Sequence, residues 1–144
     1  IQQVDIDVMG HLNIGSYVGI CYRGIRNFSS SLGITEEYIK DQKKGTFVLK
    51  SFDHYISETH LNEHVTVRSR MLGYSQNRYH SLHFIVNDTN RVLSATFEII
   101  VGHVDLELRK SCNFPQDTLI RMDELLSEHK ELELDTPTCG ILYP

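Results

Sequence analysis

The chain has 144 residues and a formal net charge of -5 at pH 7. Its length fits one domain, and its 40% hydrophobic and 23% charged residues are typical of a soluble globular protein rather than a disordered or fibrous one. The negative charge argues against binding to duplex nucleic acid, which requires a concentrated basic face. No apolar run approaches the roughly 18 residues of a membrane span, so we expect a single soluble domain over residues 1–144.

The N-terminal stretch "IQQVDIDVMGHLN" concentrates polar chemistry in few residues. Asp5 and Asp7 lie two positions apart, and His11 and Asn13 follow within the same stretch. Such a segment can be a solvated turn, a metal site, or a catalytic loop that leads into a helix. A metal site would need a further convergent ligand, and the other histidines belong to distant segments, so we do not expect a bound metal.

A helix is predicted directly after this loop, because apolar side chains recur at steps of three and four. Asn13 is suited to cap its start and Gly33 its end. The helix contains three internal glycines, which lower helix propensity, so we expect it to pack closely against a sheet. The apolar positions are Ile14, Tyr17, Val18, Cys21, Ile25, Phe28 and Leu32.

The apolar period changes to two from residue 46 onward, which indicates four or five long strands. A short helical piece near "TEEYIKDQ" precedes them, and "GYSQN" and "NDTN" are typical of hairpin turns. A second amphipathic helix is predicted over residues 117–134. This order of elements predicts an α+β fold in which one long helix packs on a curved antiparallel sheet.

The three cysteines, Cys21, Cys112 and Cys139, are widely spaced and odd in number. This pattern indicates neither a disulfide framework nor a zinc site and favours a reducing, cytoplasmic setting. Cys21 falls on the apolar face of the long helix, where we expect it to be part of the core.

The stretch "DIDVMGHLNIGSY" resembles the "D-x-D-x-x-G-H-x-N-x-x-x-Y" signature of hot-dog-fold acyl-CoA thioesterases of the 4-hydroxybenzoyl-CoA thioesterase type. The likeness continues through "LG" at the helix end and through "FVLKSFDHYI", "EHVTVRSRMLG" and "HVDLELRKSCNFP", so it covers roughly residues 4 to 126. It implies a long central helix wrapped by a curved antiparallel sheet of about five strands. It also implies that the first strand of the domain precedes Ile1 and that the protein forms a homodimer or homotetramer.

By this resemblance, Asp7 is the catalytic carboxylate, acting as a nucleophile or as a general base on water. Backbone N–H groups near Asn13 and Ile14, at the start of the helix, would polarise the thioester carbonyl. His11 would orient the loop or the reacting groups, Gly10 would permit a tight turn beside the substrate, and Tyr17 would line the acyl pocket. The implied substrate is a small-molecule acyl-CoA or an acyl-carrier-protein thioester, and no separate cofactor is implied because coenzyme A belongs to the substrate.

Coenzyme A is polyanionic, so its phosphates require basic side chains near the pocket mouth. Arg68, Arg70 and Arg78, in and near "RSRMLGYSQNR", form the local basic cluster, although solvated strand residues are the simpler interpretation of the same arginines.

The chain departs from the family where relatives carry an "E-x-A-R"-like stretch midway along the helix, because the corresponding run is "CYRGIR". This departure leaves Asp7 as the main candidate carboxylate. A rival hypothesis is a non-catalytic hot-dog module that binds an acyl thioester or a partner protein. A hot-dog dehydratase or hydratase is a third interpretation, but its histidine and acidic residues are not found.

Overall fold

The computed structural model describes residues 1–132 and 137–144. A short 3-10 turn, Gln3–Asp5, precedes the long helix α1 (Ile14–Ser31) and the short helix α2 (Glu36–Gln42). The strands are β1 (Lys44–Tyr55), β2 (Val65–Tyr74), β3 (Arg78–Asn87), β4 (Val92–Asp105) and the two-residue β5 (Lys110–Ser111). Helix α3 (Gln116–Lys130) follows the last strand.

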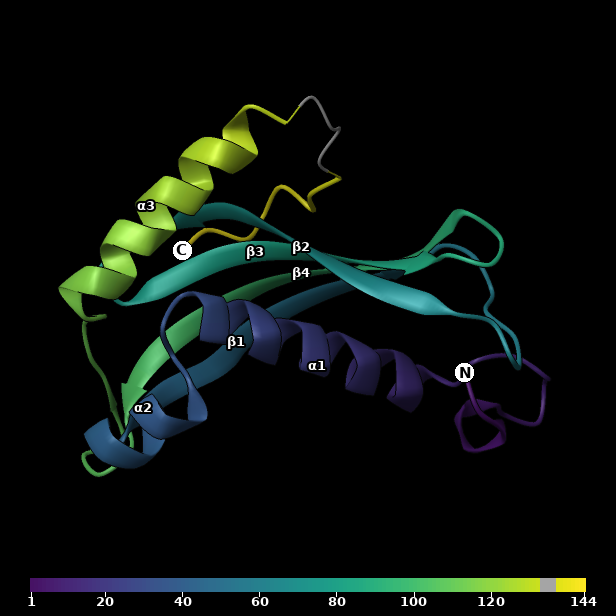
Figure 1. Ribbon diagram of the computed structural model, residues 1–144, viewed down its shortest axis with the longest axis horizontal. Coiled ribbons are helices and arrows are strands. Elements are labelled where there is room, and N and C mark those ends of the chain that lie inside the picture. Colours follow the sequence, from purple (N-terminus) through teal and green to yellow (C-terminus); the bar gives the residue numbers. More distant parts are fainter. Residues whose placement is uncertain (133–136) are drawn as a thin grey trace.

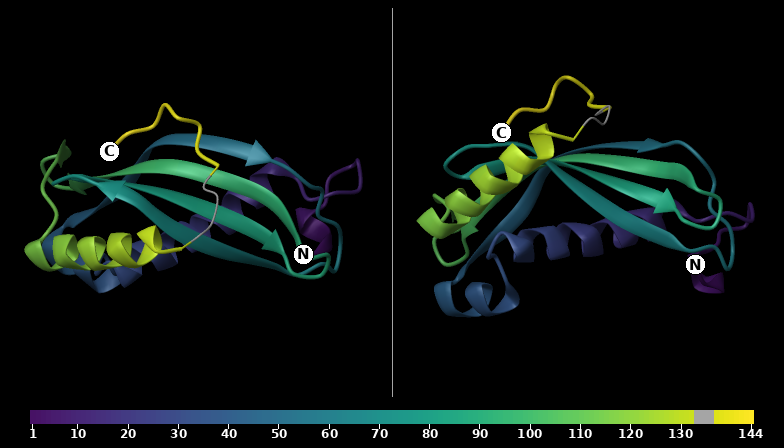
Figure 2. Two further views of the ribbon diagram at one scale, coloured as in Figure 1. Left: turned by 90° about the horizontal axis from the view of Figure 1, so that it is seen from above. Right: turned by 45° about the horizontal axis from the view of Figure 1, so that its top comes forward.

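The strands form one antiparallel sheet in the order β1-β4-β3-β2, with β5 paired to β4. The sheet is strongly curved, and α1 runs along one of its faces (Figures 1 and 2). Register shifts interrupt the β1–β4 pairing between Val48 and Lys50 and the β2–β3 pairing between Met71 and Gly73, and such irregularities increase local twist and bending. The predicted α+β hot-dog architecture is confirmed.

Local sequence signals set both ends of α1. The side chain of Asn13 accepts a hydrogen bond from the Ser16 N–H at 2.9 Å, and Gly33 follows the helix with a φ of +94°. The buried face carries Tyr17, Ile20, Cys21, Gly24, Phe28 and Ser29. The predicted apolar face is wrong at two positions, because Ile14 and Val18 are exposed and lie beside, not within, the stripe that meets the sheet.

The close packing of α1 against the sheet, expected from its three internal glycines, occurs at only one of them. A Cβ atom on Gly24 would lie 2.4 Å from Cγ1 of Val67 on β2, whereas a Cβ on Gly19 would meet nothing within 4 Å. Helix and strand therefore touch at Gly24, which explains why glycine is tolerated in the middle of this helix.

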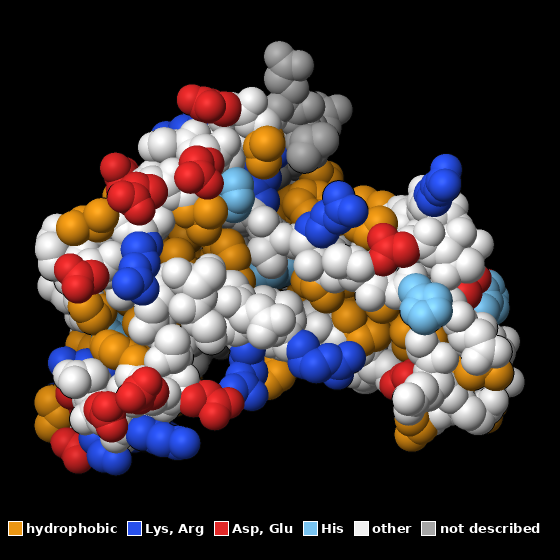
Figure 3. Space-filling view, viewed as in Figure 1, with side chains coloured by type: hydrophobic (Ala, Val, Ile, Leu, Met, Phe, Trp, Pro, Cys, Tyr) orange, Lys and Arg blue, Asp and Glu red, His pale blue; other side chains and the backbone are white. Residues whose placement is uncertain are grey.

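Helix α3 packs along β2, where the Arg70 side chain donates a hydrogen bond to the His129 carbonyl at 2.7 Å. The helix begins at Gln116 and ends at Lys130, earlier than the predicted range of 117–134, whose last two residues lie outside the described part of the chain. Acidic side chains gather over its outer surface (Figure 3).

Residues 137–144 cross the sheet face opposite α1, where the Cys139 N–H donates to Glu98. No helix in the described ranges is long and apolar enough to cross a membrane.

Candidate active site

The loop before α1 holds Asp7 in a fixed orientation. Its Oδ1 accepts a hydrogen bond from the Met9 N–H at 2.8 Å, and its backbone N–H and C=O bond the His11 carbonyl and the Gly10 N–H. Gly10 has a φ of +88°, a conformation that costs a residue with a Cβ roughly 1–2 kcal/mol. His11 Nδ1 lies 3.5 Å from Asp7 Oδ2. The turn therefore holds one carboxylate oxygen of Asp7 by a backbone N–H and places the other beside the His11 imidazole.

The N-terminus of α1 follows this loop and carries backbone N–H groups without intrahelical partners. Within the described residues, the N–H groups of Ile14 and Gly15 have no hydrogen-bond partner. The prediction for Asn13 needs a correction, because its N–H donates to the Asp5 carbonyl at 2.9 Å and cannot serve as an oxyanion donor. Asn13 instead acts through its side chain as the helix cap. Gly15, which the sequence interpretation missed, is the second free donor, as its place two residues after the cap indicates.

Asp5, two residues from Asp7, has a structural role. Its carboxylate accepts hydrogen bonds from the Gln2 N–H at 2.9 Å and from the Ser16 hydroxyl at 3.0 Å. These hydrogen bonds, the one from Gln2 first, lower the pKa of the Asp5 carboxyl below its ordinary value. Asp5 thus ties the N-terminal turn to the first turn of α1. Asp7, in contrast, lines the pocket described below.

An open pocket of about 400 Å³ lies between this loop and the end of β1. Asp7, His11, Asn13, Ile14 and Tyr17, all predicted site residues, line it together. Gly10 is not among the lining residues and shapes the turn instead. The remaining lining residues are Met9, Leu12 and the segment 55–58. The structure therefore gathers most of the predicted catalytic residues around one cavity.

The opposite wall of the pocket comes from Tyr55 and the residues after it, which the sequence interpretation did not assign to the site. Tyr17 donates its hydroxyl proton toward the Ser57 carbonyl at 3.1 Å and lies 3.2 Å from Thr59 Oγ1. The ring of Tyr55 meets Tyr17 edge to face, with 5.3 Å between ring centroids. No local sequence signal joins these segments, because they are about 40 residues apart and meet only in the folded sheet.

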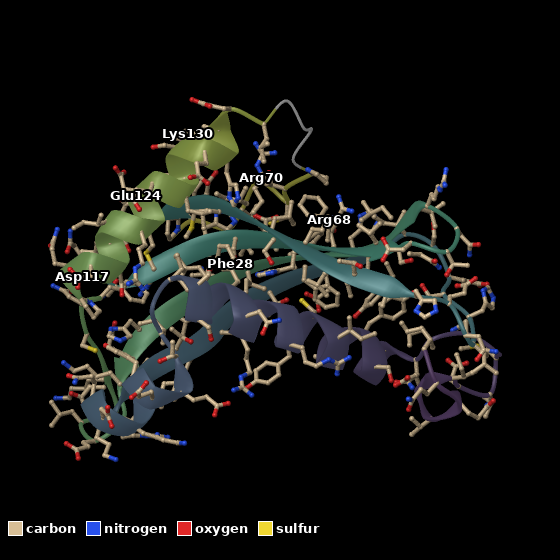
Figure 4. The ribbon with its side chains drawn as sticks, viewed as in Figure 1. Phe28, Arg68, Arg70, Asp117, Glu124 and Lys130 are labelled. Atoms are coloured by element: carbon tan, nitrogen blue, oxygen red, sulfur yellow. The ribbon has the colours of Figure 1, made fainter. Side chains whose placement is uncertain are left out.

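The structure does not bring the three predicted coenzyme A arginines to this pocket. Arg68 and Arg70 lie on β2, the edge strand furthest from β1, and Figure 4 shows them on the side of the sheet that carries α3. Arg78 pairs with Gly102 on β4, and Tyr55 in the pocket pairs with Ala95 on the same strand. These two positions on β4 are seven residues apart. That separation corresponds to about 23 Å of strand. Within one chain, none of the three lines the pocket, so their role in binding coenzyme A stays a prediction.

Other chemistries have less support in the structure. Within residues 1–132 and 137–144, no three His, Cys, Asp or Glu side chains gather closely enough to hold a metal ion. Cys21 lies in the core as predicted, and its burial, with the Asp53 carboxylate, raises the pKa of its thiol to about 12. A protonated, inaccessible thiol cannot act as a nucleophile at neutral pH.

A long helix packed on a curved antiparallel sheet is the hot-dog architecture, and a carboxylate lies in the loop that leads into that helix. The comparison with family models agrees, since the model of the thioesterase-like superfamily matches residues 1–122. The chain belongs to this superfamily, and the thioesterase predicted from the sequence is confirmed at the level of the family.

The similar proteins share little sequence identity with this chain, and the solved structures among them have nearly the same fold. The chain is 23% identical to the betainyl-CoA thioesterase of Pseudomonas aeruginosa over 127 residues, which cover 88% of this chain and 80% of the relative. A Staphylococcus aureus protein solved in complex with CoA has a TM-score of 0.83 at 19% identity, with 95% and 91% of the two chains covered. The DHNA-CoA thioesterase of the same organism has a TM-score of 0.81 at 18% identity, with 91% and 89% covered. These structural likenesses establish the fold.

Proposed function

We propose that the protein hydrolyses an acyl-CoA thioester to a free acid and coenzyme A, with Asp7 as the catalytic carboxylate. The observation that carries this proposal is that Asp7 and Ile14, the first residue of α1, line one pocket at the N-terminus of that helix. A module that only binds the thioester has no need for a base or nucleophile at its carbonyl.

In the proposed reaction, the N–H groups of Ile14 and Gly15 donate to the thioester oxygen, where negative charge develops during attack. The dipole of α1 stabilises that charge further. As a general base, Asp7 takes a proton from water while the water oxygen bonds to the carbonyl carbon. The carbon–sulfur bond then breaks and the proton passes to the leaving thiolate. As a nucleophile, Asp7 would itself bond to the carbonyl carbon and the carbon–sulfur bond would break to release the thiolate. Water would then cleave the resulting anhydride, which restores the Asp7 carboxylate, releases the acid and supplies a proton to the thiolate.

The proposed active unit is a homodimer formed through β1. This strand is an edge of the sheet and exposes apolar side chains along its length, which is a hazard unless another chain covers them. Helix α1 adds the exposed residues Ile14, Val18 and Tyr22, and Tyr22 and Val48 line a common cavity. An antiparallel edge strand is complementary to a second copy of itself. Because Ile14 and Tyr55 also line the Asp7 pocket, the second copy would border the site.

The first test is a hydrolysis assay on a panel of acyl-CoAs, including betainyl-CoA, aromatic and long-chain thioesters, with released thiol measured over time. Calorimetric titration with a non-hydrolysable thioether analogue of each acyl-CoA runs in parallel. Turnover of at least one thioester supports the proposal. Tight binding of an analogue, without turnover of any member of the panel, would instead identify a non-catalytic acyl-thioester module.

A further inference from the structure

The charged groups around the Asp7 pocket are of one sign. Asp7 and Glu58 contribute carboxylates, His11 is the single imidazole, and no Lys or Arg is found among the described lining residues. Glu58 is at the rim, with a side chain 69% exposed and an oxygen 3.5 Å from His60 Nε2. A pocket with this balance disfavours an acyl group that carries a carboxylate and favours one that carries a positive charge.

Two aromatic rings form an inner corner of the same pocket. Tyr17 and Tyr55 meet at an interplanar angle of 68°, so their faces point in different directions. The faces of aromatic rings carry negative partial charge and attract cations, most strongly where water is excluded. Tyr17 is almost fully buried, whereas Tyr55 is 40% exposed.

Both rings are held in place by contacts with neighbouring protein groups. The hydroxyl of Tyr17 is held by the Ser57 carbonyl and by Thr59, and Thr59 in turn donates to Ser94 at 2.9 Å. The ring of Tyr55 packs edge to face on Phe97, with 6.0 Å between centroids. A fixed pair of rings lowers the entropic cost of binding, because neither side chain must be ordered by the ligand. Burial, followed by the Asp53 carboxylate, raises the pKa of Tyr55, which keeps its hydroxyl neutral.

We infer that the pocket selects a short acyl group with a fixed positive charge, such as a quaternary ammonium, held against Tyr17 and Tyr55 and attracted by Asp7 and Glu58. This inference rests on the proposed function and names its substrate class. The volume of about 400 Å³ accommodates a trimethylammonium group on a short acyl chain. Asp7 is near both the reacting carbonyl and the cation in this arrangement, so the charge of the substrate also favours its delivery to the catalytic carboxylate.

The test compares two thioesters of the same shape, betainyl-CoA (trimethylammonioacetyl-CoA) and 3,3-dimethylbutyryl-CoA, which differ by one nitrogen in place of carbon and by one charge. We expect kcat/KM to be at least about 10-fold higher for the cationic thioester, a ratio within the range of cation–π and charge contributions. The substitution Tyr55→Leu should reduce this ratio at least about threefold, while Tyr55→Phe, which keeps the aromatic face, should preserve it.

Equal kcat/KM values, or a preference for the neutral thioester, would overturn the inferred selectivity and leave the proposed hydrolysis intact. Turnover of other panel members with none of either test compound would overturn it as well. Failure to hydrolyse any thioester in the panel would instead overturn the proposed function. A ratio that is unchanged in Tyr55→Leu and that falls in Glu58→Gln would reject the aromatic contribution.

Discussion

The hydroxyl of Tyr17 lies 3.1 Å from the Ser57 carbonyl oxygen and links the first turn of α1 to the segment that follows β1. This hydrogen bond joins the two walls of the pocket, one carrying Asp7 and the other carrying Tyr55. The relative position of Asp7, the proposed catalytic carboxylate, and the opposite pocket wall therefore depends on a contact between residues 40 positions apart in the chain.

The substitution Tyr17→Phe removes this link while it keeps the ring. We expect the free energy of unfolding to fall by about 0.5–1.5 kcal/mol, because one partly buried hydrogen bond is lost. We also expect KM for an acyl-CoA to rise more than kcat falls, since the pocket walls are less firmly joined. Urea unfolding and steady-state kinetics measure both effects. An unchanged KM with a normal stability would show that the hydroxyl does not position the pocket.

The proposed dimer predicts different outcomes for two surface substitutions of similar exposure. Phe52 on β1 is 47% exposed and Ile120 on α3 is 48% exposed. Phe52→Lys should convert the dimer to a monomer, because it places a charge in the apolar interface, whereas Ile120→Lys should leave the dimer intact. Sedimentation velocity measures the mass of each variant. A monomeric unmodified protein, or a dimer unaffected by Phe52→Lys, would contradict the β1 interface.

Two glycines of α1 provide a matched pair for the packing of helix on sheet. Gly24→Ala should destabilise the protein by about 1–3 kcal/mol, because the new methyl group overlaps Val67 in a packed contact. Gly19→Ala meets nothing within 4 Å and should stabilise the helix by about 0.5–1 kcal/mol. Denaturant unfolding of both variants checks the difference. Equal effects at the two positions would mean that α1 does not approach β2 at Gly24.

Buried His83 should make stability depend on pH. Serine hydroxyls bond both ring nitrogens, at 2.8 Å for Ser69 and 3.0 Å for Ser81, and burial lowers the pKa of the imidazole to about 4. Because the unfolded chain takes up the proton near pH 6.5 and the folded chain does not, this contribution is complete above pH 6.5 and declines as pH falls toward 4.

His83 alone should therefore lower the free energy of unfolding by about 2 kcal/mol between pH 7 and pH 5. The variant His83→Gln keeps polar groups for the two serines and does not titrate, so its stability should change less over this interval. Urea unfolding of both proteins at the two pH values measures the difference. The same pH dependence in both would show that His83 is not the group responsible.

The sequence predicts features of this protein that depend on neighbouring residues. The Asn13 cap, the Gly33 terminus and the turn at Gly10 are encoded within a few positions, and the structure contains all three. Periodicity correctly places one face of α1 against the sheet. It cannot show which flanking apolar residues lie outside that contact, and Ile14 and Val18, which the periodicity places on the apolar face, are exposed.

The parts of the site that the sequence did not reveal depend on pairing between distant strands. The β1–β4 register places Tyr55 opposite Ala95, at the end of the sheet near Asp7, while the β3–β4 register places Arg78 toward the other end. Arginines close together in the sequence are thus far from the pocket, and a tyrosine 48 positions after Asp7 lies in it. Strand order and register, which no local pattern specifies, account for both differences.

The central claim is that Asp7, and not its neighbour Asp5, performs the chemistry, and a matched pair of substitutions tests it most directly. Asp7→Asn should lower kcat for the preferred acyl-CoA at least about 100-fold, the low end of general-base contributions. Asp5→Asn should lower kcat less than about fivefold, because the amide oxygen can still accept the Gln2 hydrogen bond while the amide NH2 donates to the Ser16 hydroxyl oxygen. Circular dichroism and thermal unfolding confirm that both variants are folded. Near-normal kcat in a folded Asp7→Asn variant, or an equal loss in both, would contradict the assignment of the catalytic carboxylate.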